Sequence, residues 1–174
     1  AGGHCHITHI DRGVLEFLGS RKGCGSLLDV GCGVGGQVQQ ALEMGWGAFG
    51  IDVDLGAIGA PNVALIDLVQ QPVIFHEKFD VVWSVETAEH IPEEFDDNYL
   101  QTLVENCGRY LVMTARNIPM HLHVNCKPRE HWIEALEKKG MWYDDLGYRK
   151  ILEHSTMERE FLRDTGMFFI NRRD

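Results

Sequence analysis

The sequence is short of basic residues relative to acidic ones. It contains 16 Lys and Arg against 26 Asp and Glu, so its formal net charge is −10 at neutral pH. The basic residues that stand together form only pairs, Arg21-Lys22, Lys138-Lys139 and Arg172-Arg173. Because an acidic protein without a basic patch repels a phosphate backbone, nucleic acid is a disfavoured partner.

Long apolar runs and cysteine motifs are also lacking. No run approaches the ~18 apolar residues that span a bilayer, and the glycine- and histidine-rich start lacks the apolar core of a signal peptide. The five cysteines are odd in number and form no C-x-x-C pair, which is typical of free thiols in a reducing compartment. We therefore expect a cytoplasmic protein that is not embedded in a membrane.

Zinc-binding spacings such as C-x-x-C and H-E-x-x-H are absent as well. Four side chains able to bind metal crowd the start of the chain, namely His4, Cys5, His6 and His9. We interpret them as a solvated tail. The sequence therefore predicts no metal site.

Strands alternate with helices along the whole chain. The patterns predict strands at Ser26–Val30, Ala48–Val53, Val63–Ile66, Phe79–Ser84, Arg109–Thr114 and Met167–Ile170, and helices at Asp11–Gly19, Gln37–Met44, Glu93–Asn106, Pro128–Lys139 and around Thr156–Asp164. This order is typical of a doubly wound α/β fold, a mostly parallel sheet with helices on both faces. No linker divides residues 1–174, so we expect one domain, with residues 1–20 as an N-terminal segment or lid.

The segment LLDVGCGVGGQV, residues 27–38, joins the first predicted strand to the next helix. Gly31, Gly33 and Gly36 satisfy the spacing G-x-G-x-x-G. Such glycines allow a tight turn and let a ligand approach the backbone and the helix N-terminus. The loop fits two cofactor classes equally, a dinucleotide and an adenosyl methyl donor.

Two aspartates help to separate these classes. Asp29 lies at the end of the apolar first strand, where a carboxylate would repel a dinucleotide's pyrophosphate but attract a cationic amino group and sulfonium. Asp52 ends the second strand and can accept hydrogen bonds from both ribose hydroxyls, which fits either cofactor. Asp29 therefore favours the methyl donor.

Taken in order, "LLDVGCGVGG", "FGIDVD", "LIDL" and "FDVVWSVETAEHIP" resemble the motifs of class I S-adenosylmethionine-dependent methyltransferases. The resemblance extends from about Asp11 to Gly140. It implies a seven-stranded sheet whose last strand is antiparallel at the edge, and S-adenosylmethionine as cofactor. It also implies that the cofactor is held by Asp29, Gly31, Cys32, Gly33 and Gly35, by Asp52 and Val53, by Asp67 and Leu68, and by Ser84 and Val85.

The methyl acceptor is less well marked. The chain lacks the [DN]-P-P-[YFW] signature of amino-directed nucleic-acid methyltransferases, and no Pro-Cys pair of cytosine-C5 enzymes follows the fourth strand. The segment after the fifth strand loosely resembles small bacterial or phage-borne methyltransferases that act on sugars or secondary metabolites. We therefore expect an oxygen of a small metabolite or sugar as acceptor, and a protein side chain stays open as the alternative.

Two clusters could assist transfer to a hydroxyl group. Glu86, Glu89 and His90 follow the fourth strand, and a helical turn there would place Glu86 and His90 on one face. His121, His123 and Asn125 follow the fifth strand, and an extended segment would align all three.

From these clusters we take four candidate catalytic residues, His90, His123, Glu86 and His121, since histidine titrates near neutral pH. One alternative remains, in which His121 and His123 meet Glu86 or Glu89 in space and hold a divalent ion.

Two other functions stay open at this point. One is a nicotinamide-dependent oxidoreductase, which Asp29 disfavours. The other is a binding module that keeps the nucleotide pocket but does not turn over. The oligomeric state is left open.

Overall fold

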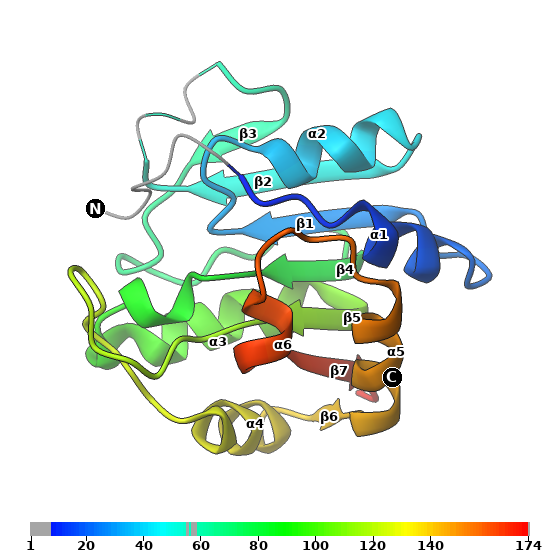
Figure 1. The fold of residues 1–174 in the computed structure, drawn as a ribbon. Helices are drawn as coiled ribbons and strands as arrows, with labels where there is room; N and C mark the ends of the chain where they lie inside the picture. Colours follow the sequence, from blue (N-terminus) through cyan, green and yellow to red (C-terminus); the bar gives the residue numbers. More distant parts are fainter. Residues whose placement is uncertain (1–7, 55, 57–58, 174) are drawn as a thin grey trace.

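A seven-stranded sheet forms the centre of the molecule, in strand order β3-β2-β1-β4-β5-β7-β6 (Figure 1). The computed structural model describes residues 8–54, 56 and 59–173. The strands are β1 (Ser26–Val30), β2 (Gly47–Asp52), β3 (Val63–Leu65), β4 (Phe79–Ser84), β5 (Cys107–Met113), β6 (Met141–Tyr143) and β7 (Met167–Asn171). The sheet confirms the predicted α/β fold class.

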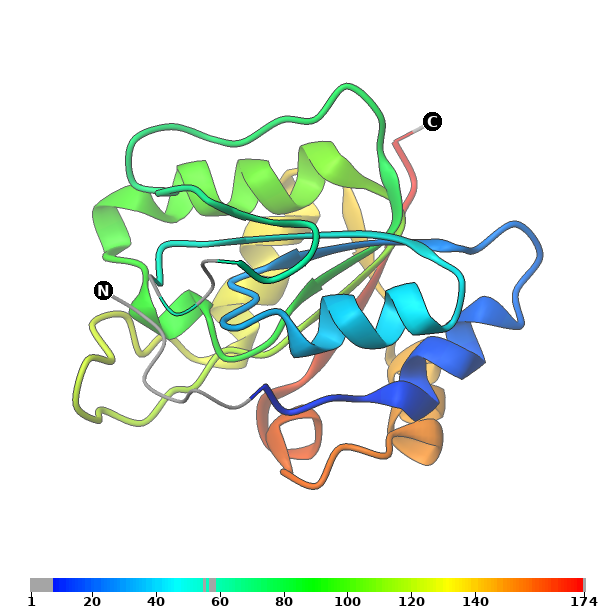
Figure 2. The ribbon, with the colours of Figure 1, turned by 90° about the horizontal axis from the view of Figure 1, so that it is seen from above.

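Helices cover both faces of this sheet. They are α1 (Arg12–Gly19), α2 (Gly36–Glu43), α3 (Asp96–Asn106), α4 (Arg129–Lys138), α5 (Asp145–His154) and α6 (Phe161–Thr165), with two short 3₁₀ turns, η2 (Ala88–His90) and η3 (Glu93–Phe95). Seen from above, α3 lies on one side of the sheet and α1 and α2 lie on the other (Figure 2). Within the described residues, no helix combines the length and apolar character that crossing a membrane requires.

The strand directions determine where a ligand can bind. β3, β2, β1, β4 and β5 pair in parallel, whereas β7 pairs antiparallel with both β5 and β6. The carboxyl ends of the parallel strands therefore meet at one edge, which is where open α/β sheets bind ligands. Asp29, Asp52 and the residues after Ser84 all lie at this edge.

Most predicted elements are confirmed to within a few residues, but the C-terminal part differs. β7 is antiparallel as expected, yet β6 and not β7 forms the sheet edge. The sequence analysis missed β6, which has three residues, and α5, which lies before the predicted helical stretch 156–164; only α6 forms there. Short edge strands carry too few residues for a clear alternation of apolar side chains.

Two apolar clusters hold the layers together. On one face, Leu28 and Val82 of the sheet pack with Tyr99 of α3 and Trp132 of α4. On the other face, the cluster joins neighbouring sheet residues to α1, α2 and α5. Because side chains alternate along a strand, the buried central strands contribute to both clusters, as parallel strands covered on both faces do.

Asp11 connects the start of the described chain to its C-terminal part. Its side chain accepts the backbone N–H of Val14 at 3.0 Å and so caps α1. It also accepts the N–H of Thr156 at 3.0 Å and the hydroxyl of Ser155. The carboxylate is fully buried, so these donors depend on it.

We predict that Asp11→Ala lowers the free energy of unfolding by about 3 kcal/mol, because it removes a cap and leaves buried donors unpaired. Asp144→Ala is the matched control, since Asp144 caps α5 through the N–H of Gly147. It is expected to cost about 1 kcal/mol. Urea denaturation measures both, and equal losses would contradict the bridging role of Asp11.

Candidate active site

One large pocket opens at the carboxyl ends of the parallel strands. Its volume is about 900 Å³, near the upper end of the range for ligand pockets. Most of the predicted site residues line it: Asp29, Gly31, Cys32, Gly33, Asp52, Val53, Asp67, Leu68, Val85, Glu86, His90, His121 and His123. The structure therefore brings both proposed histidine clusters into the pocket that contains Asp29.

Two predicted cofactor residues do not line this pocket. Ser84 is fully buried and donates its hydroxyl hydrogen bond to the Val30 carbonyl at 2.8 Å, so it ties β4 to β1. Gly35 is the N-cap of α2 with φ of 81°. A Cβ there would lie 2.9 Å from a methyl group of Val63, so Gly35 shapes the turn.

Gly31 and Gly33 make the floor of the pocket. Both have positive φ, 79° and 53° respectively, which favours glycine. A Cβ on Gly31 would lie 2.1 Å from the hydroxyl oxygen of Thr87, whereas a Cβ on Gly33 would meet only open space. Gly31 is therefore required by protein packing, and Gly33 leaves its backbone open to a ligand.

Asp29 is a buried carboxylate at the end of β1, only 3% exposed. No hydrogen bond to its side chain occurs among the described residues. Burial, and to a smaller extent the nearby Asp52 carboxylate, raises the pKa of Asp29 to about 8. A carboxylate in this position favours a cationic ligand, because a positive charge would offset both causes of the shift.

Asp52 is held at the neighbouring strand end. Its Oδ2 accepts the N–H of Gly33 at 2.7 Å, and its Oδ1 accepts the N–H of Asp54 at 2.8 Å. Each carboxylate oxygen has two acceptor positions, so both can still accept a hydroxyl hydrogen. The geometry fits the two hydroxyls of a ribose.

The comparisons with known proteins agree with this geometry. A family model described as a methyltransferase domain matches residues 28–114, half of the chain. The chain belongs to this methyltransferase family. It is a class I S-adenosylmethionine-dependent methyltransferase, and the oxidoreductase and non-enzymatic alternatives are set aside.

Several solved structures share the fold. One is magnesium protoporphyrin IX methyltransferase from Synechocystis with bound S-adenosylmethionine, which has a TM-score of 0.62 at 17% identity. The match covers 91% of this chain and 76% of the Synechocystis chain. A TehB-like methyltransferase from Corynebacterium glutamicum has a TM-score of 0.64 at 15% identity, covering 92% and 88%. The plantazolicin methyltransferase BpumL has a TM-score of 0.62 at 15% identity, covering 92% and 83%.

The pocket of this methyltransferase fits the cofactor in chemical terms. S-adenosylmethionine carries an ammonium group, a sulfonium, a ribose and an adenine. The buried Asp29 carboxylate suits the first two, Asp52 suits the ribose, and Asp67 with Leu68 lies further along the same wall. The open backbone at Gly33 leaves room for close approach.

Glu86 takes a different position from the one expected. It has a positive φ of 57°, so no helical turn aligns it with His90; the only helical turn there is η2. Its carboxylate accepts the Thr114 hydroxyl at 2.9 Å and pairs with Arg116 at 2.5 Å. The hydrogen bond from the Arg116 guanidinium to Glu86 raises the pKa of Arg116. Glu86 is therefore engaged in an ion pair.

The second cluster also differs from the expected alignment. Leu122 has a positive φ of 70°, which breaks the extended course between His121 and His123. Asn125 is buried and donates to Asp96 at 2.6 Å instead of facing the pocket with the histidines. Both histidines still line the pocket, on a turn closed by the bond from His123 N–H to the Met120 carbonyl at 3.1 Å.

Several pocket residues were missed by the sequence analysis. Thr8, His9, Gln37, Met120 and Phe161 line the pocket but lie outside the motifs of the family, and Thr87 lies inside one without having been selected as a site residue. His9 and Thr8 are the described part of the predicted N-terminal lid that reaches the pocket, whereas α1 packs into the core. The sequence analysis also missed Arg116, which follows the buried Thr114 by two residues and pairs with Glu86.

Cys32 also lines the pocket but does not act as a nucleophile in this environment. It is 3% exposed, and burial together with the charges of Asp29 and Asp52 raises the pKa of its thiol. The reactive form of cysteine is the thiolate, which such surroundings suppress. Cys32 instead fills the space beside Gly50, where a Cβ would lie 2.7 Å from its sulfur.

The raised pKa of Asp29 predicts a pH-dependent stability of the cofactor-free protein. Between about pH 4 and about pH 8 the folded protein binds a proton on Asp29 that the unfolded chain has lost. The free energy of unfolding therefore falls as pH rises through this window, by up to about 1.4 kcal/mol per pH unit.

Asp29→Asn removes this contribution, so its stability should depend less steeply on pH between 4 and 8. Urea titrations at a series of pH values measure the slope. The exposed Asp97 offers a matched control, since Asp97→Asn should leave the wild-type slope in place. A wild-type slope in Asp29→Asn would show that Asp29 does not carry the proton.

Proposed function

We propose that this methyltransferase transfers its methyl group to an oxygen atom of a small metabolite or sugar. The observation that carries the proposal is the continuity of one pocket, from Asp29 at one end to His90, His121 and His123 at the other. When bound, S-adenosylmethionine supplies an electrophilic methyl group on a sulfonium. A hydroxyl acceptor must lose its proton, and histidine is suited to assist near neutral pH.

The tautomers of two histidines support this role. Nδ1 of His90 lies 3.1 Å from the Leu122 carbonyl, and Nδ1 of His123 lies 3.1 Å from the Ile118 carbonyl. A carbonyl only accepts, so each Nδ1 carries the hydrogen, and in the neutral ring Nε2 has the lone pair. The ring of His123 is thus oriented to act as a base through Nε2.

Glu86 and His121 receive lesser roles in the proposal. Glu86 is a positioning residue, because its carboxylate orients Arg116, whose guanidinium lies 5.1 Å from the centre of the Phe161 ring at the pocket wall. His121 is exposed and lies at the pocket rim, where it can contact an acceptor.

The size and lining of the pocket support a small acceptor. About 900 Å³ lies near the upper end of the range for ligand pockets, so any acceptor that shares the pocket with the cofactor must be small. The acceptor end includes Met120, Leu122 and Val124, which are exposed apolar side chains. Such a rim suits a molecule with both apolar surface and hydroxyl groups.

The proposal for the cofactor end is tested by calorimetry with S-adenosylhomocysteine, which keeps the ammonium group. Asp29→Ala should weaken binding by roughly a hundredfold, because it removes the carboxylate that pairs with that cation. Asp97→Ala on the exposed face of α3 is the control. Wild-type affinity in Asp29→Ala would contradict the assigned role of Asp29.

The acceptor is tested with methyl-labelled S-adenosylmethionine and a panel of small hydroxyl compounds, with matched amines and thiols. The label should appear in methyl ethers. His123→Ala should lower kcat roughly a hundredfold or more while S-adenosylhomocysteine binding stays unchanged. His76→Ala, at an exposed position outside the pocket lining, should behave as wild type. Labelling of amines alone, or of nucleic acid, would contradict transfer to a small hydroxyl compound.

A further inference from the structure

Glu89 is a buried acidic group whose charge is not accounted for within the protein. It is fully buried, and both of its carboxylate oxygens lack a hydrogen-bond partner among the described residues. Its side chain lines the pocket at the acceptor end. Burying a carboxylate without a partner is costly, so such a group in a pocket points to a ligand that completes it.

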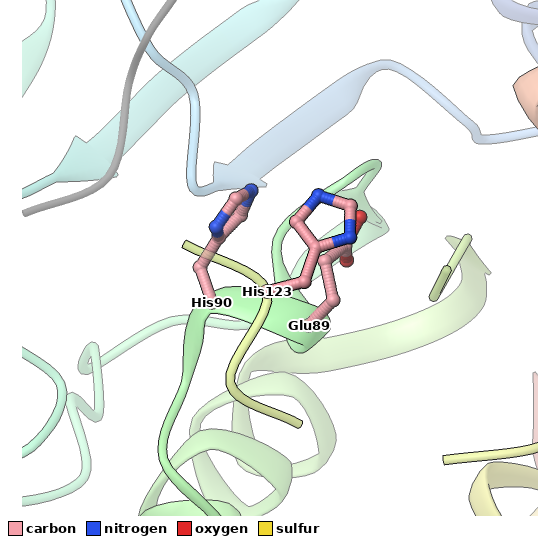
Figure 3. A group of neighbouring side chains, drawn as sticks. All are labelled: Glu89, His90 and His123. Atoms are coloured by element: carbon pink, nitrogen blue, oxygen red, sulfur yellow. The ribbon is translucent and has the colours of Figure 1, made fainter. Parts of the chain in front are cut away.

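Two histidines stand beside this carboxylate. One potential ligand atom from each of Glu89, His90 and His123 lies within 4.8 Å of the others. Figure 3 shows the two imidazole rings side by side, with the Glu89 carboxylate next to the ring of His123. In the part of the chain that the structure describes, no other three histidine, cysteine or acidic side chains gather in this way.

The cluster is held together by backbone bonds between two loops. The Glu89 carbonyl accepts the N–H groups of Val124 and Asn125 at 2.8 and 3.1 Å. The bond from His90 to the Leu122 carbonyl adds a third link between the same segments. The three side chains therefore belong to one preorganised unit, although 33 positions separate His90 from His123.

The two imidazoles also have the second interactions that metal-bound histidines need. Each donates its Nδ1 hydrogen to a backbone carbonyl, which orients the ring and puts the lone pair of the neutral imidazole on Nε2. The three ligand atoms need to move only slightly to bind one ion. Two atoms that each lie about 2.1 Å from the same ion are no more than ~4.2 Å apart. Ring movements of about 1 Å would bring the three groups into that range.

We propose that Glu89, His90 and His123 bind a divalent transition-metal ion at the acceptor end of the pocket. Two imidazoles and one carboxylate suit zinc, manganese, iron or cobalt, whereas magnesium and calcium prefer oxygen ligands. Three protein ligands leave coordination positions open toward the pocket. The nearby Glu86 is paired with Arg116 and is not needed as a ligand.

The role of this ion rests on the proposed transfer to oxygen. When the ion is bound, the histidines are ligands and do not act as bases: an acceptor hydroxyl bound at an open position becomes more acidic and loses its proton to water. The oxygen then forms the new bond to the methyl carbon as the bond from that carbon to sulfur breaks. The products are a methyl ether, S-adenosylhomocysteine and one proton.

The site is tested first by binding, without any acceptor. Chelator-treated protein is titrated with Mn²⁺, followed by electron paramagnetic resonance, and with Co²⁺, followed by visible absorption. Wild type should bind one ion per chain. Glu89→Gln and His123→Gln should each weaken binding by roughly tenfold or more.

Matched controls separate this site from chance binding elsewhere. Glu77→Gln and His76→Gln remove the same side-chain types at exposed neighbouring positions and should bind as wild type. Joint replacement of His4 and His6 by alanine tests the histidine-rich start of the chain and should also leave binding in place. Absence of binding in wild type, or wild-type binding in both Glu89→Gln and His123→Gln, would overturn the proposal.

A second arm tests the role of the ion separately. Chelation should abolish transfer to a hydroxyl acceptor, with recovery on adding Mn²⁺ or Co²⁺, while S-adenosylhomocysteine affinity stays the same. Specific ion binding with chelator-resistant transfer would retain the site and refute its Lewis-acid role. Chelator-sensitive labelling of amines alone would refute transfer to oxygen and not the binding site.

Discussion

The structure depends on carboxylates that are buried at the open edge of a parallel sheet. Asp29 is carried there by β1, between β2 and β4, where apolar residues surround the strand on both faces. Asp52 ends the neighbouring strand, so two acidic groups share one pocket in a protein of net charge −10. A cation bound there relieves both burial and repulsion, which makes a cationic cofactor a physical complement to the fold.

The acceptor end of the pocket also contains a buried carboxylate, that of Glu89, but in different surroundings. Glu89 is as fully buried as the core residues. Burial, and to a smaller extent the neighbouring Glu86 carboxylate, raises its pKa to about 8. Glu86 is paired with Arg116, but Glu89 has no such partner within the described residues. Its neighbours are the lone-pair donors His90 and His123, which cannot compensate a carboxylate without a further positive charge.

The cofactor end could be predicted from the sequence because its signals are local. Asp29 and the glycines lie within a single strand-turn-helix segment, and Asp52 follows one strand later, so spacing and polarity identify them together. Asp67 and Leu68 follow the same logic one strand further. Ser84 and Gly35 lie in the expected segments but do not line the pocket. Ser84 bonds to the Val30 carbonyl and Gly35 lies against Val63, and such contacts with residues distant in sequence decide which way a residue faces.

The acceptor end could be predicted only as a set of residue types. The patterns expected a helix to align Glu86 with His90 and an extended strand to align His121, His123 and Asn125. Positive φ values at Glu86 and Leu122 interrupt the expected helix and the expected extended segment. Because neither residue is a glycine, the sequence contains no signal for these turns. From the sequence alone, an ion held by His121 and His123 with Glu86 or Glu89 was only an alternative, because Glu89 and His123 come together through contacts between loops and not through a fixed spacing.

This division between the two ends has a consequence for how the pocket can change. The cofactor end is built from strand register and a glycine turn, so its geometry is shared with the whole sheet. The acceptor end is built from η2 and the segment 118–125, which are joined through the Glu89 carbonyl and the His90 ring. Substitutions at the exposed side chains of Met120 and Val124 alter the pocket rim without breaking those backbone bonds. The acceptor range can therefore vary on this fold while the carboxylates to which we assign cofactor binding stay fixed.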